Sequence, residues 1–198
     1  AQPSALGEVI TGSVTGTGGQ LATAAQNYVV ESGETPTQTT LMIDPITADN
    51  VVLSSEKDGS NNIAVTGKVG GVFATGDTVT ITVNGNNYTG TAAADGTFSI
   101  DVPFTGLQSD NDTTVDGTVT GTGGTVANAL QDYAVNPAIA PDPTLKTALY
   151  IDPISSNADN ILSLSEQGNA TTTVTGFVSG TYAAGDKVSL LINGTSYR

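Results

Sequence analysis

The side chains best suited to chemistry in this sequence are carboxylates and carboxamides grouped in segments that read as loops. Two of these groups share one pattern, and further acids stand in later loops. The residues are Asp49, Asn50 and Glu56, their repeats Asp159, Asn160 and Glu166, and Asp110, Asp112 and Asp142. Two carboxylates about 4 Å apart repel by roughly 4 kcal/mol at an effective dielectric near 20. Because only 5 Lys and Arg accompany 19 Asp and Glu, a bound cation is the natural compensation.

Calcium is the cation that these residue types fit. It takes about six to eight oxygen ligands from Asp, Glu, Asn and backbone carbonyls, and it tolerates irregular geometry. Zinc and copper prefer imidazole or thiolate ligands, and the chain has no His and no Cys. The sequence therefore predicts Ca2+ as a ligand. The competing interpretation is that the acids are solvated loop residues, with Asp49 and Asp110 capping turns.

The overall charge narrows the range of partners and activities. A formal net charge of −14 repels nucleic acid and anionic membrane surfaces. No apolar run approaches the roughly 18 residues that span a bilayer, so membrane insertion is not expected. Enzymatic activity is not expected either, because there is no His to activate a nucleophile and no Cys to serve as one. The glycine-rich segment 121–124 lacks the spacing of a phosphate-binding loop.

Internal repetition is the strongest signal in the sequence. The segment 12–19 recurs with one change at 117–124, 105 positions later. The segment 43–46 recurs unchanged at 151–154, 108 positions later. This period matches the roughly 100 residues of an immunoglobulin-like domain.

The repeats divide the chain into one complete unit and two partial ones. Residues 1–36 correspond to the C-terminal part of a repeat, residues 37–140 to a complete repeat, and residues 141–198 to the N-terminal half of a following repeat. Only the counterparts of residues 90–105 are unrepresented in the two partial units together. A segment of a longer array would look like this. The alternative is that neighbouring chains complete each other's partial repeats.

Strands with one apolar face account for most of the complete unit. Apolar residues alternate with polar ones at Ile63, Val65 and Val69, at Val79, Ile81 and Val83, and at Phe98, Ile100 and Val102, and continue at Val115, Val119, Tyr133 and Val135. This alternation is typical of half-buried antiparallel strands. Asn84-Gly85, Asn193-Gly194 and Asp95-Gly96 are hairpin signals. The predicted fold class is all-β, with tandem immunoglobulin-like antiparallel β-sandwich domains.

The segments between the units are expected to act as joints. They span residues 31–40 and 136–147, and the second contains Pro137, Pro141 and Pro143, which favour an extended, semi-rigid spacer. Such joints suit a rod better than a compact pair of domains. In a sandwich, the acidic loops around Asp49 and Asp110 should face the next joint, where Asp142 stands.

The ordered series of motifs in the complete unit resembles a known family. The series reads Ile43-Asp44-Pro45-Ile46-Thr47-Ala48-Asp49-Asn50, then Glu56, Val65-Thr66-Gly67, Gly76-Asp77-Thr78-Val79-Thr80, Val83-Asn84-Gly85, Tyr88-Thr89-Gly90 and Asp95-Gly96-Thr97-Phe98. It resembles the immunoglobulin-like extender repeats of giant bacterial surface adhesins exported by type I secretion. The resemblance covers essentially the whole chain.

The resemblance implies a mechanical role outside the cell. Extender repeats hold a ligand-binding tip away from the bacterial surface, and calcium at the joints between domains stiffens the array. Asp49, Asn50, Glu56 and their repeats then become candidate ligands, and neighbouring repeats of the same or an adjacent chain become the partners. A second hypothesis is a subunit of an extracellular filament or surface layer, assembled by contacts or strand exchange between chains. A third is a glycan-binding module, for which Tyr182 is the best exposed aromatic residue.

Overall fold

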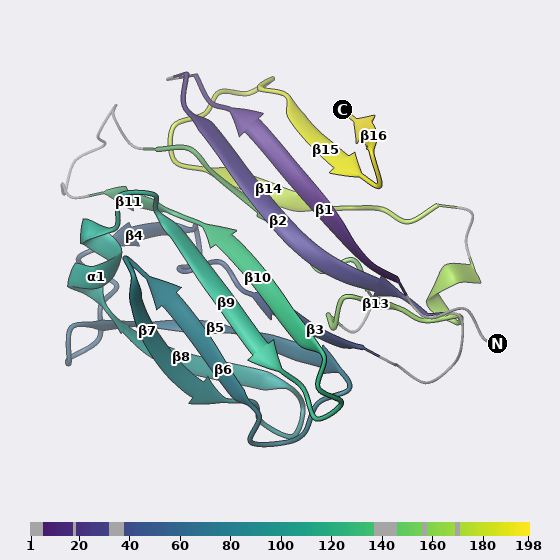
Figure 1. Ribbon diagram of the computed structural model, residues 1–198. Coiled ribbons are helices and arrows are strands. Elements are labelled where there is room, and N and C mark those ends of the chain that lie inside the picture. The colour runs from purple at the N-terminus through teal and green to yellow at the C-terminus, as the bar shows by residue number, and fades with distance from the viewer. Residues whose placement is uncertain (1–5, 18, 32–37, 137–145, 156–157, 169–170) are drawn as a thin grey trace.

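The computed structural model describes residues 6–17, 19–31, 38–136, 146–155, 158–168 and 171–198. Within these residues the chain forms sixteen β-strands, one short α-helix and one 3-10 turn, so the predicted all-β class is confirmed. The strands build two β-sandwiches, which lie at the lower left and upper right of Figure 1. The described helices are too short and too polar to cross a bilayer.

The first sandwich, which we call the complete sandwich, consists of residues 39–136. Its smaller sheet has the order β3-β5-β8, and its larger sheet has the order β7-β6-β9-β10. The strands are β3 (Thr39–Ile43), β4 (Val51–Leu53), β5 (Asn62–Gly71), β6 (Thr78–Val83), β7 (Asn86–Thr91), β8 (Thr97–Pro103), β9 (Thr114–Thr120), β10 (Val126–Asp132) and β11 (Ala134–Asn136), with α1 (Phe104–Ser109) after β8. The short strands β4 and β11 pair in parallel at one end.

The core of the complete sandwich is the set of apolar residues that alternate along its strands. β6 and β8 bury every second residue, because successive side chains of a strand point to opposite faces. Val65, Val79 and Ile81 are fully buried, with 0% of each exposed. Tyr133 is equally buried and closes the core from the segment between β10 and β11. The inward positions predicted from the sequence are confirmed, except that Val135 of β11 is only partly buried.

Two of the three predicted hairpins, at Asn84-Gly85 and Asn193-Gly194, are present. Asn84 and Gly85 have φ angles of 48° and 72° and join β6 to β7. Positive φ at both central residues is the requirement of the type I′ turn, whose twist matches that of the flanking strands. The hairpin predicted at Asp95-Gly96 is wrong, because β7 and β8 lie in different sheets and do not pair. Gly96, with φ of 83°, instead sits in the turn that carries the chain from one sheet to the other. A Cβ at position 96 would lie 2.0 Å from the carbonyl oxygen of Val69, so only glycine fits there.

The second sandwich, which we call the composite sandwich, is assembled from both ends of the chain. Its larger sheet has the order β16-β15-β1-β2, with β13 pairing in parallel with β2, and its smaller sheet has only β12 and β14 among the described residues. The strands are β1 (Leu6–Thr15), β2 (Leu21–Val30), β12 (Ala148–Ile151), β13 (Ile161–Leu162), β14 (Gly176–Ser179), β15 (Val188–Ile192) and β16 (Thr195–Tyr197), and the 3-10 turn η1 spans Glu166–Gly168.

The composite sandwich reproduces the strand register of the complete one. In the complete sandwich Val79 of β6 lies opposite Val119 of β9. In the composite sandwich their repeat counterparts, Val188 of β15 and Val14 of β1, lie opposite each other. The parallel pairs agree as well, since Val51 faces Ala134 in one and Ile161 faces Val29 in the other. The two partial repeats therefore complete each other within a single chain.

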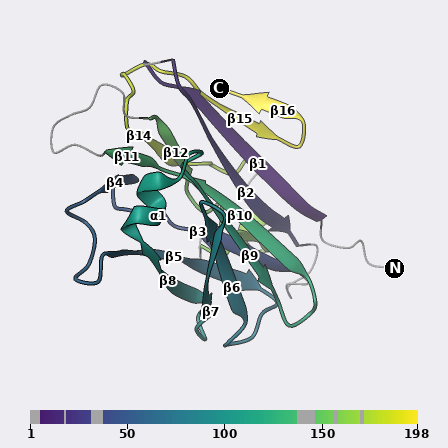
Figure 2. The same ribbon diagram turned by 60° about the vertical axis from the view of Figure 1, so that its left-hand side comes forward.

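The two sandwiches lie side by side, as both views show (Figures 1 and 2), whereas the sequence favoured an end-to-end rod. The larger sheets join where β2 meets β10, at Ala25 opposite Leu130. These two residues occupy the same position of the repeat, so the junction lies on an approximate two-fold axis. The Thr23 amide donates a 2.7 Å hydrogen bond to Asp132 Oδ2 across this junction. The contact covers part of two sheet edges, because β2 and β10 pair at this one position.

Candidate functional site

The predicted ligands Asp49 and Asn50 form a tight turn between β3 and β4. The Asp49 carboxylate accepts hydrogen bonds from the Val51 amide at 3.0 Å and the Thr47 hydroxyl at 3.1 Å. Asn50 is fully buried with φ of 57°, and its Oδ1 accepts from the Ile46 amide at 3.0 Å. Its Nδ2 donates to the Asp132 carbonyl at 2.7 Å. Both ends of the Asn50 amide thus hold β4 beside β11.

The repeat of this motif forms the same kind of turn in the composite sandwich. Asp159 Oδ1 accepts from the Ile161 amide at 2.9 Å and lies 2.8 Å from the Ser155 hydroxyl. Asn160 is fully buried with φ of 58°, and its Oδ1 accepts from the Ile154 amide at 3.2 Å. The recurrence of the Asp-Asn pair therefore has a structural cause. A metal-binding role for Asn50 or Asn160 would require these amide hydrogen bonds to break, and it stays a prediction.

Glu56 and Glu166 each close the turn that follows the short parallel strand. Glu56 Oε2 accepts from the Leu53 amide at 2.8 Å. Glu166 Oε2 accepts from the Ser163 amide at 3.1 Å and the Ser163 hydroxyl at 2.8 Å. Partial burial, and to a smaller degree the Asp49 charge, raise the pKa of Glu56 above its usual value. A ligand role for Asp49 and Glu56 stays a prediction.

Asp110 and Asp112 are two predicted ligands that line the same hollow. Asp110 is 7% exposed, and its Oδ2 lies 3.0 Å from the Tyr133 hydroxyl and 3.3 Å from the Thr114 amide. Burial first, and then the neighbouring Asp112 charge, raise the pKa of Asp110. The two carboxylates line an open hollow of about 250 Å³ beside the Asn84-Gly85 hairpin.

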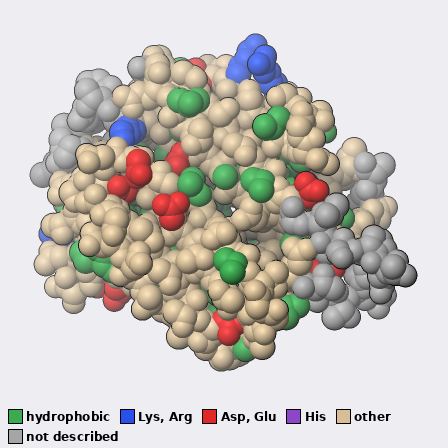
Figure 3. Space-filling view, in the orientation of Figure 1, with side chains coloured by type: hydrophobic (Ala, Val, Ile, Leu, Met, Phe, Trp, Pro, Cys, Tyr) green, Lys and Arg blue, Asp and Glu red, His purple; other side chains and the backbone are tan. Residues whose placement is uncertain are grey.

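Two strand residues that the sequence analysis missed, Asp116 and Asp132, extend this acidic group. Asp116 lines the same hollow, and Asp132 lies 3.2 Å from the Thr114 hydroxyl through Oδ1. Burial is the main cause that raises the pKa of each, and Asp112 adds to it in both cases. Several acidic side chains lie close together on the left of the face in Figure 3. Both acids stand at outward positions of strands, where a charged side chain is ordinarily just exposed to solvent. The sequence therefore offered no reason to single them out.

A basic residue also reaches the loop between α1 and β9. Lys146, which precedes β12, donates a 2.9 Å hydrogen bond from Nζ to the Asn111 carbonyl and lies 3.5 Å from the Thr113 hydroxyl. The loop that carries Asp110 and Asp112 therefore meets the chain as it enters the next unit, as predicted. Asp142, the remaining predicted ligand, lies outside the described residues.

The donor chemistry of the acidic hollow fits calcium, but the described residues do not by themselves complete a site. The raised pKa values of Asp110 and Asp116 show that their charged forms are destabilised by burial and by the neighbouring Asp112 charge. A bound divalent cation would offset this electrostatic repulsion. Within the described part of the chain, no group of three or more His, Cys, Asp or Glu side chains is arranged to hold a metal ion. Further oxygen ligands would have to come from elsewhere.

Comparison with known proteins relates the chain to bacterial adhesin domains. No family model and no curated protein matches it significantly. A bacterial immunoglobulin-like domain from the M. primoryensis ice-binding adhesin is 34% identical, with a TM-score of 0.43; the match covers 52% of this chain and 99% of that domain. A Ca2+-stabilized adhesin that helps an Antarctic bacterium reach out and bind ice is 26% identical, with a TM-score of 0.44; the match covers 98% of this chain and 54% of that one.

A third solved structure belongs to a 1.5-MDa bacterial ice-binding adhesin and concerns its retention at the host cell surface. It is 22% identical, with a TM-score of 0.45, and the match covers 100% of this chain and 72% of that one. The sequence identity to the M. primoryensis domain extends over nearly the whole of that domain and accompanies the repeated sandwich described above. The chain belongs to the bacterial immunoglobulin-like domains.

Proposed function

We propose that the chain is an extender segment of a bacterial cell-surface adhesin, in which tandem immunoglobulin-like domains space a binding tip away from the cell. The observation that carries this proposal is repetition at the level of strand register. The same pairs of repeat positions lie opposite each other in both sandwiches. A chain that builds the same sandwich twice is suited to length, because each added repeat lengthens an array by a constant step.

The surface of the chain suits an extracellular array. A net charge of −14 makes neighbouring chains repel each other and keeps a concentrated array soluble. The acids are spread over the faces of the sandwiches, while the apolar residues are largely inside. The side-by-side packing seen here follows from the way residues 6–30 and 148–197 meet beside the complete sandwich. In a longer array each repeat would be completed by its own continuous chain.

The extender role predicts that length depends linearly on repeat number. Proteins with one, two and four tandem copies of residues 38–145 would be compared by small-angle X-ray scattering. The maximum dimension is expected to grow by a constant increment per repeat, because each sandwich adds its own long axis. A dimension that grows only as the cube root of mass would mean that the repeats collapse against each other, and the extender role would then be wrong.

We also propose that calcium binds at the joint after the complete sandwich. Asp110 and Asp112 are the first candidates because they are already adjacent, and Asp142 is the third. The other predicted ligands are weaker candidates, because their side chains hold turns: Asp49, Asn50, Glu56, Asp159, Asn160 and Glu166. Support for calcium comes from the mutual repulsion of Asp110 and Asp112, which line one hollow. The Lys146 ammonium group at the same loop is a competing cation.

Calorimetric titration of CaCl2 into the whole chain tests the calcium proposal. Saturable binding is expected, and Asp112→Asn combined with Asp142→Asn is expected to abolish it. The matched control is Asp101→Asn combined with Asp58→Asn, which removes the same charge from exposed positions. Binding that survives the first pair, or that both pairs weaken equally, would show only a diffuse attraction of calcium to an acidic surface. That outcome would leave the extender role intact.

The filament hypothesis rests on a different observation. Residues 6–30 complete a sandwich begun by residues 148–197, and two chains could exchange these halves with the same register. Exchange between chains would make the mass of the protein depend on concentration. Light scattering at concentrations from about 1 to 500 μM distinguishes the two roles, because the extender is expected to stay monomeric throughout that range.

A further inference from the structure

The tip of the hairpin between β6 and β7 is the exposed pair Asn84-Gly85. Its φ angles are 48° and 72°, and the same pair recurs at Asn193-Gly194 with φ of 47° and 76°. The ladder between β6 and β7 ends at Val83 opposite Asn86, so the two turn residues lie outside it. The tip is therefore held only at its base.

An asparagine followed by a glycine carries a reactive pair of groups. The amide nitrogen of the second residue can bond to the side-chain carbonyl carbon of the first, because the two atoms close a five-membered ring. Ring closure requires the nitrogen to eclipse Cβ, which for an L-residue means ψ of about −120°, the value at the first central residue of a type II′ turn. In the type I′ turn seen here ψ is about +30°, so the Gly85 nitrogen is turned away from Asn84 Cγ.

A flip of the one peptide group between Asn84 and Gly85 brings these two atoms together. The flip converts type I′ into type II′ and leaves the base of the hairpin in place, since only ψ of Asn84 and φ of Gly85 change substantially. Glycine accepts either sign of φ. A Cβ placed on Gly85 would meet no atom within 4 Å, so the space around this peptide group is open. Because glycine is preferred at the first position of a type II′ turn, the flipped state is a minor one and the reaction is slow.

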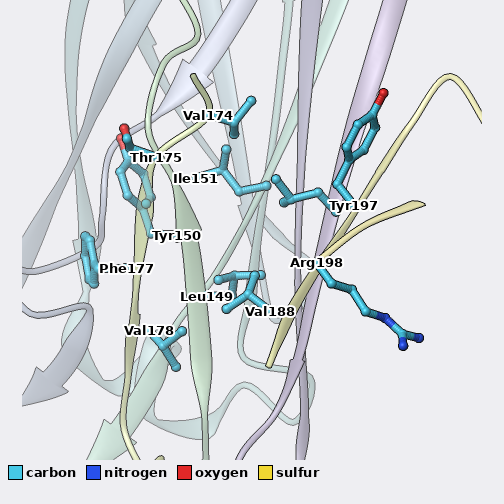
Figure 4. A pocket seen from close by; sticks show the side chains of 12 residues that line it. Leu149, Tyr150, Ile151, Val174, Thr175, Phe177, Val178, Val188, Tyr197 and Arg198 are labelled. Carbon is cyan, nitrogen blue, oxygen red and sulfur yellow. The ribbon is translucent and has the colours of Figure 1, made fainter. Parts of the chain in front are cut away.

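The Asn84 side chain also lines the acidic hollow. Its Nδ2 donates a 3.0 Å hydrogen bond to Ser109 Oγ, and Asp110, Asp112 and Asp116 line the same hollow. The groove of about 540 Å³ beside β14, by contrast, has walls made largely of valine and leucine side chains (Figure 4). A new charge at position 84 would therefore act on carboxylates that already repel one another.

We propose that Asn84 is a site of spontaneous covalent modification, at which the chain converts its own carboxamide into a carboxylate. The Gly85 nitrogen bonds to Asn84 Cγ, the Cγ–Nδ2 bond breaks, and Nδ2 leaves as ammonia with the proton of the Gly85 amide. One water molecule then opens the ring at either of its two carbonyl groups, which gives aspartate or isoaspartate. The reaction consumes one water, releases one ammonia and requires no oxidant, reductant or enzyme.

The modification adds a fourth carboxylate to the hollow. Both products carry the new charge, and the loss of ammonia makes the change irreversible, so it accumulates with the age of the protein. The added carboxylate stands beside Asp110, Asp112 and Asp116 and raises the affinity of the hollow for a divalent cation. This consequence rests on the calcium proposal above, whereas the modification itself does not.

Peptide mass spectrometry of the whole chain after incubation in neutral buffer tests the modification. The Asn84 peptide is expected to gain one mass unit at least about tenfold faster than the site at Asn86, an exposed asparagine of the same hairpin whose next residue, Asn87, has a side chain that hinders ring closure. The rate is expected to rise with pH, because the attacking nitrogen must lose its proton. Asn84→Gln keeps the carboxamide but requires a six-membered ring, and it should remove the signal.

Calcium titration of the Asn84→Asp variant tests the consequence. This variant is expected to bind calcium about threefold or more tightly than the unmodified chain. Asn86→Asp is the matched control, because it adds the same charge to a residue that does not line the hollow. Equal tightening by both variants would mean that only net charge matters. A chain that converts at Asn84 but binds no calcium would contradict the calcium proposal and leave the modification standing.

Two outcomes would overturn the modification. Equal rates at Asn84 and Asn86 would mean that the turn and its glycine have no special part in the reaction. An unchanged mass at Asn84, under conditions in which a free peptide of residues 82–88 converts completely, would mean that the hairpin prevents the flip.

Discussion

The complete and composite sandwiches differ in how the chain runs through them, yet they share every strand pair that both contain. In one, all strands come from a single continuous stretch, residues 39–136; in the other, the paired strands β1 and β15 come from opposite ends of the chain. The strand register is the same because it depends on which face of each strand is apolar, and not on how the loops connect the strands. What differs is closure. Val79 and Ile81 are fully buried, whereas Val188 and Leu190 are only half-buried.

Strand pairing and exclusion of water from the core are separate properties of these sandwiches. Pairing partners are specified locally, by the match between two alternating strands. Exclusion of water from the core requires every strand, including β8. The composite sandwich pairs its strands correctly but excludes water from its core less completely. It should therefore be the less stable of the two.

Removing the central side chain of β8 is expected to have the largest effect on this difference. Phe98 is 5% exposed in the core, and Phe98→Ala is expected to lower the free energy of unfolding of the complete sandwich by about 3–5 kcal/mol. Phe177→Ala in the composite sandwich should cost about 0.5–1.5 kcal/mol, since its ring pairs mainly with Tyr150. Hydrogen exchange in urea measures the two sandwiches separately. Equal losses would contradict this expectation.

The buried tyrosine that closes the complete core should show the next largest difference. Tyr133→Phe removes a hydroxyl that lies between the Leu107 carbonyl and Asp110, and it should cost about 1–3 kcal/mol. Its counterpart is Tyr28, but Ala5 stands where the complete repeat has Asp110. Tyr28→Phe is therefore expected to cost less than half as much. Thermal unfolding of the two variants provides the measurement, and a larger loss for Tyr28→Phe would contradict it.

The pH dependence of stability should also belong mainly to the complete sandwich. The folded-state pKa values of Asp110, Asp116 and Asp132 are raised, so the folded protein holds protons that the unfolded chain has lost. Stability is then greatest below the ordinary carboxyl pKa near 4 and falls as pH rises through the raised values. The melting temperature should rise on acidification from pH 7 toward about pH 5.

A single substitution tests the origin of this pH dependence. Asp112→Asn removes the charge common to all three groups and should raise the melting temperature at pH 7 while flattening the pH dependence. Asp101→Asn, on the exposed face of β8, is the control and should leave the slope almost unchanged. If both variants flatten it equally, the effect comes from net charge and not from the acidic hollow.

The smallest expected effect concerns the joint. Lys146→Gln gives the second unit the residue that stands at the equivalent position, Gln38, before the complete sandwich. Loss of the hydrogen bond to the Asn111 carbonyl should cost less than about 1 kcal/mol, because the contact is exposed. Differential scanning calorimetry at low and high salt checks it. A loss above about 2 kcal/mol would mean that Lys146 also neutralises Asp110 and Asp112.

Much of the fold could be predicted because its determinants are local. Alternation at Val79, Ile81 and Val83 specified both a strand and its inward face. The Asn84-Gly85 pair specified the hairpin that follows, since both residues must adopt positive φ. The helix α1 was not predicted, because its six residues are too few to show a helical period.

The union of the two partial repeats could not be predicted, because the strands of every repeat carry the same pattern. Nothing local distinguishes a β1 that pairs with β15 of its own chain from one that pairs with another chain. For the same reason, the recurrence of Asp49 and Asn50 at Asp159 and Asn160 could not separate a ligand pair from a turn. The structure adds the hydrogen bond from Asn50 Nδ2 to the Asp132 carbonyl, a residue 82 positions away that comes close to Asn50 only in the folded chain.

The long separation between partners in the composite sandwich also sets an order of folding. Val79 pairs with Val119, 40 positions away, whereas Val14 pairs with Val188, 174 positions away. Loop-closure entropy makes the longer closure about 1.3 kcal/mol more costly before any contact forms. The complete sandwich should therefore form first. Once folded, it shortens the path between the two ends, so the slow kinetic phase of refolding should report the composite sandwich.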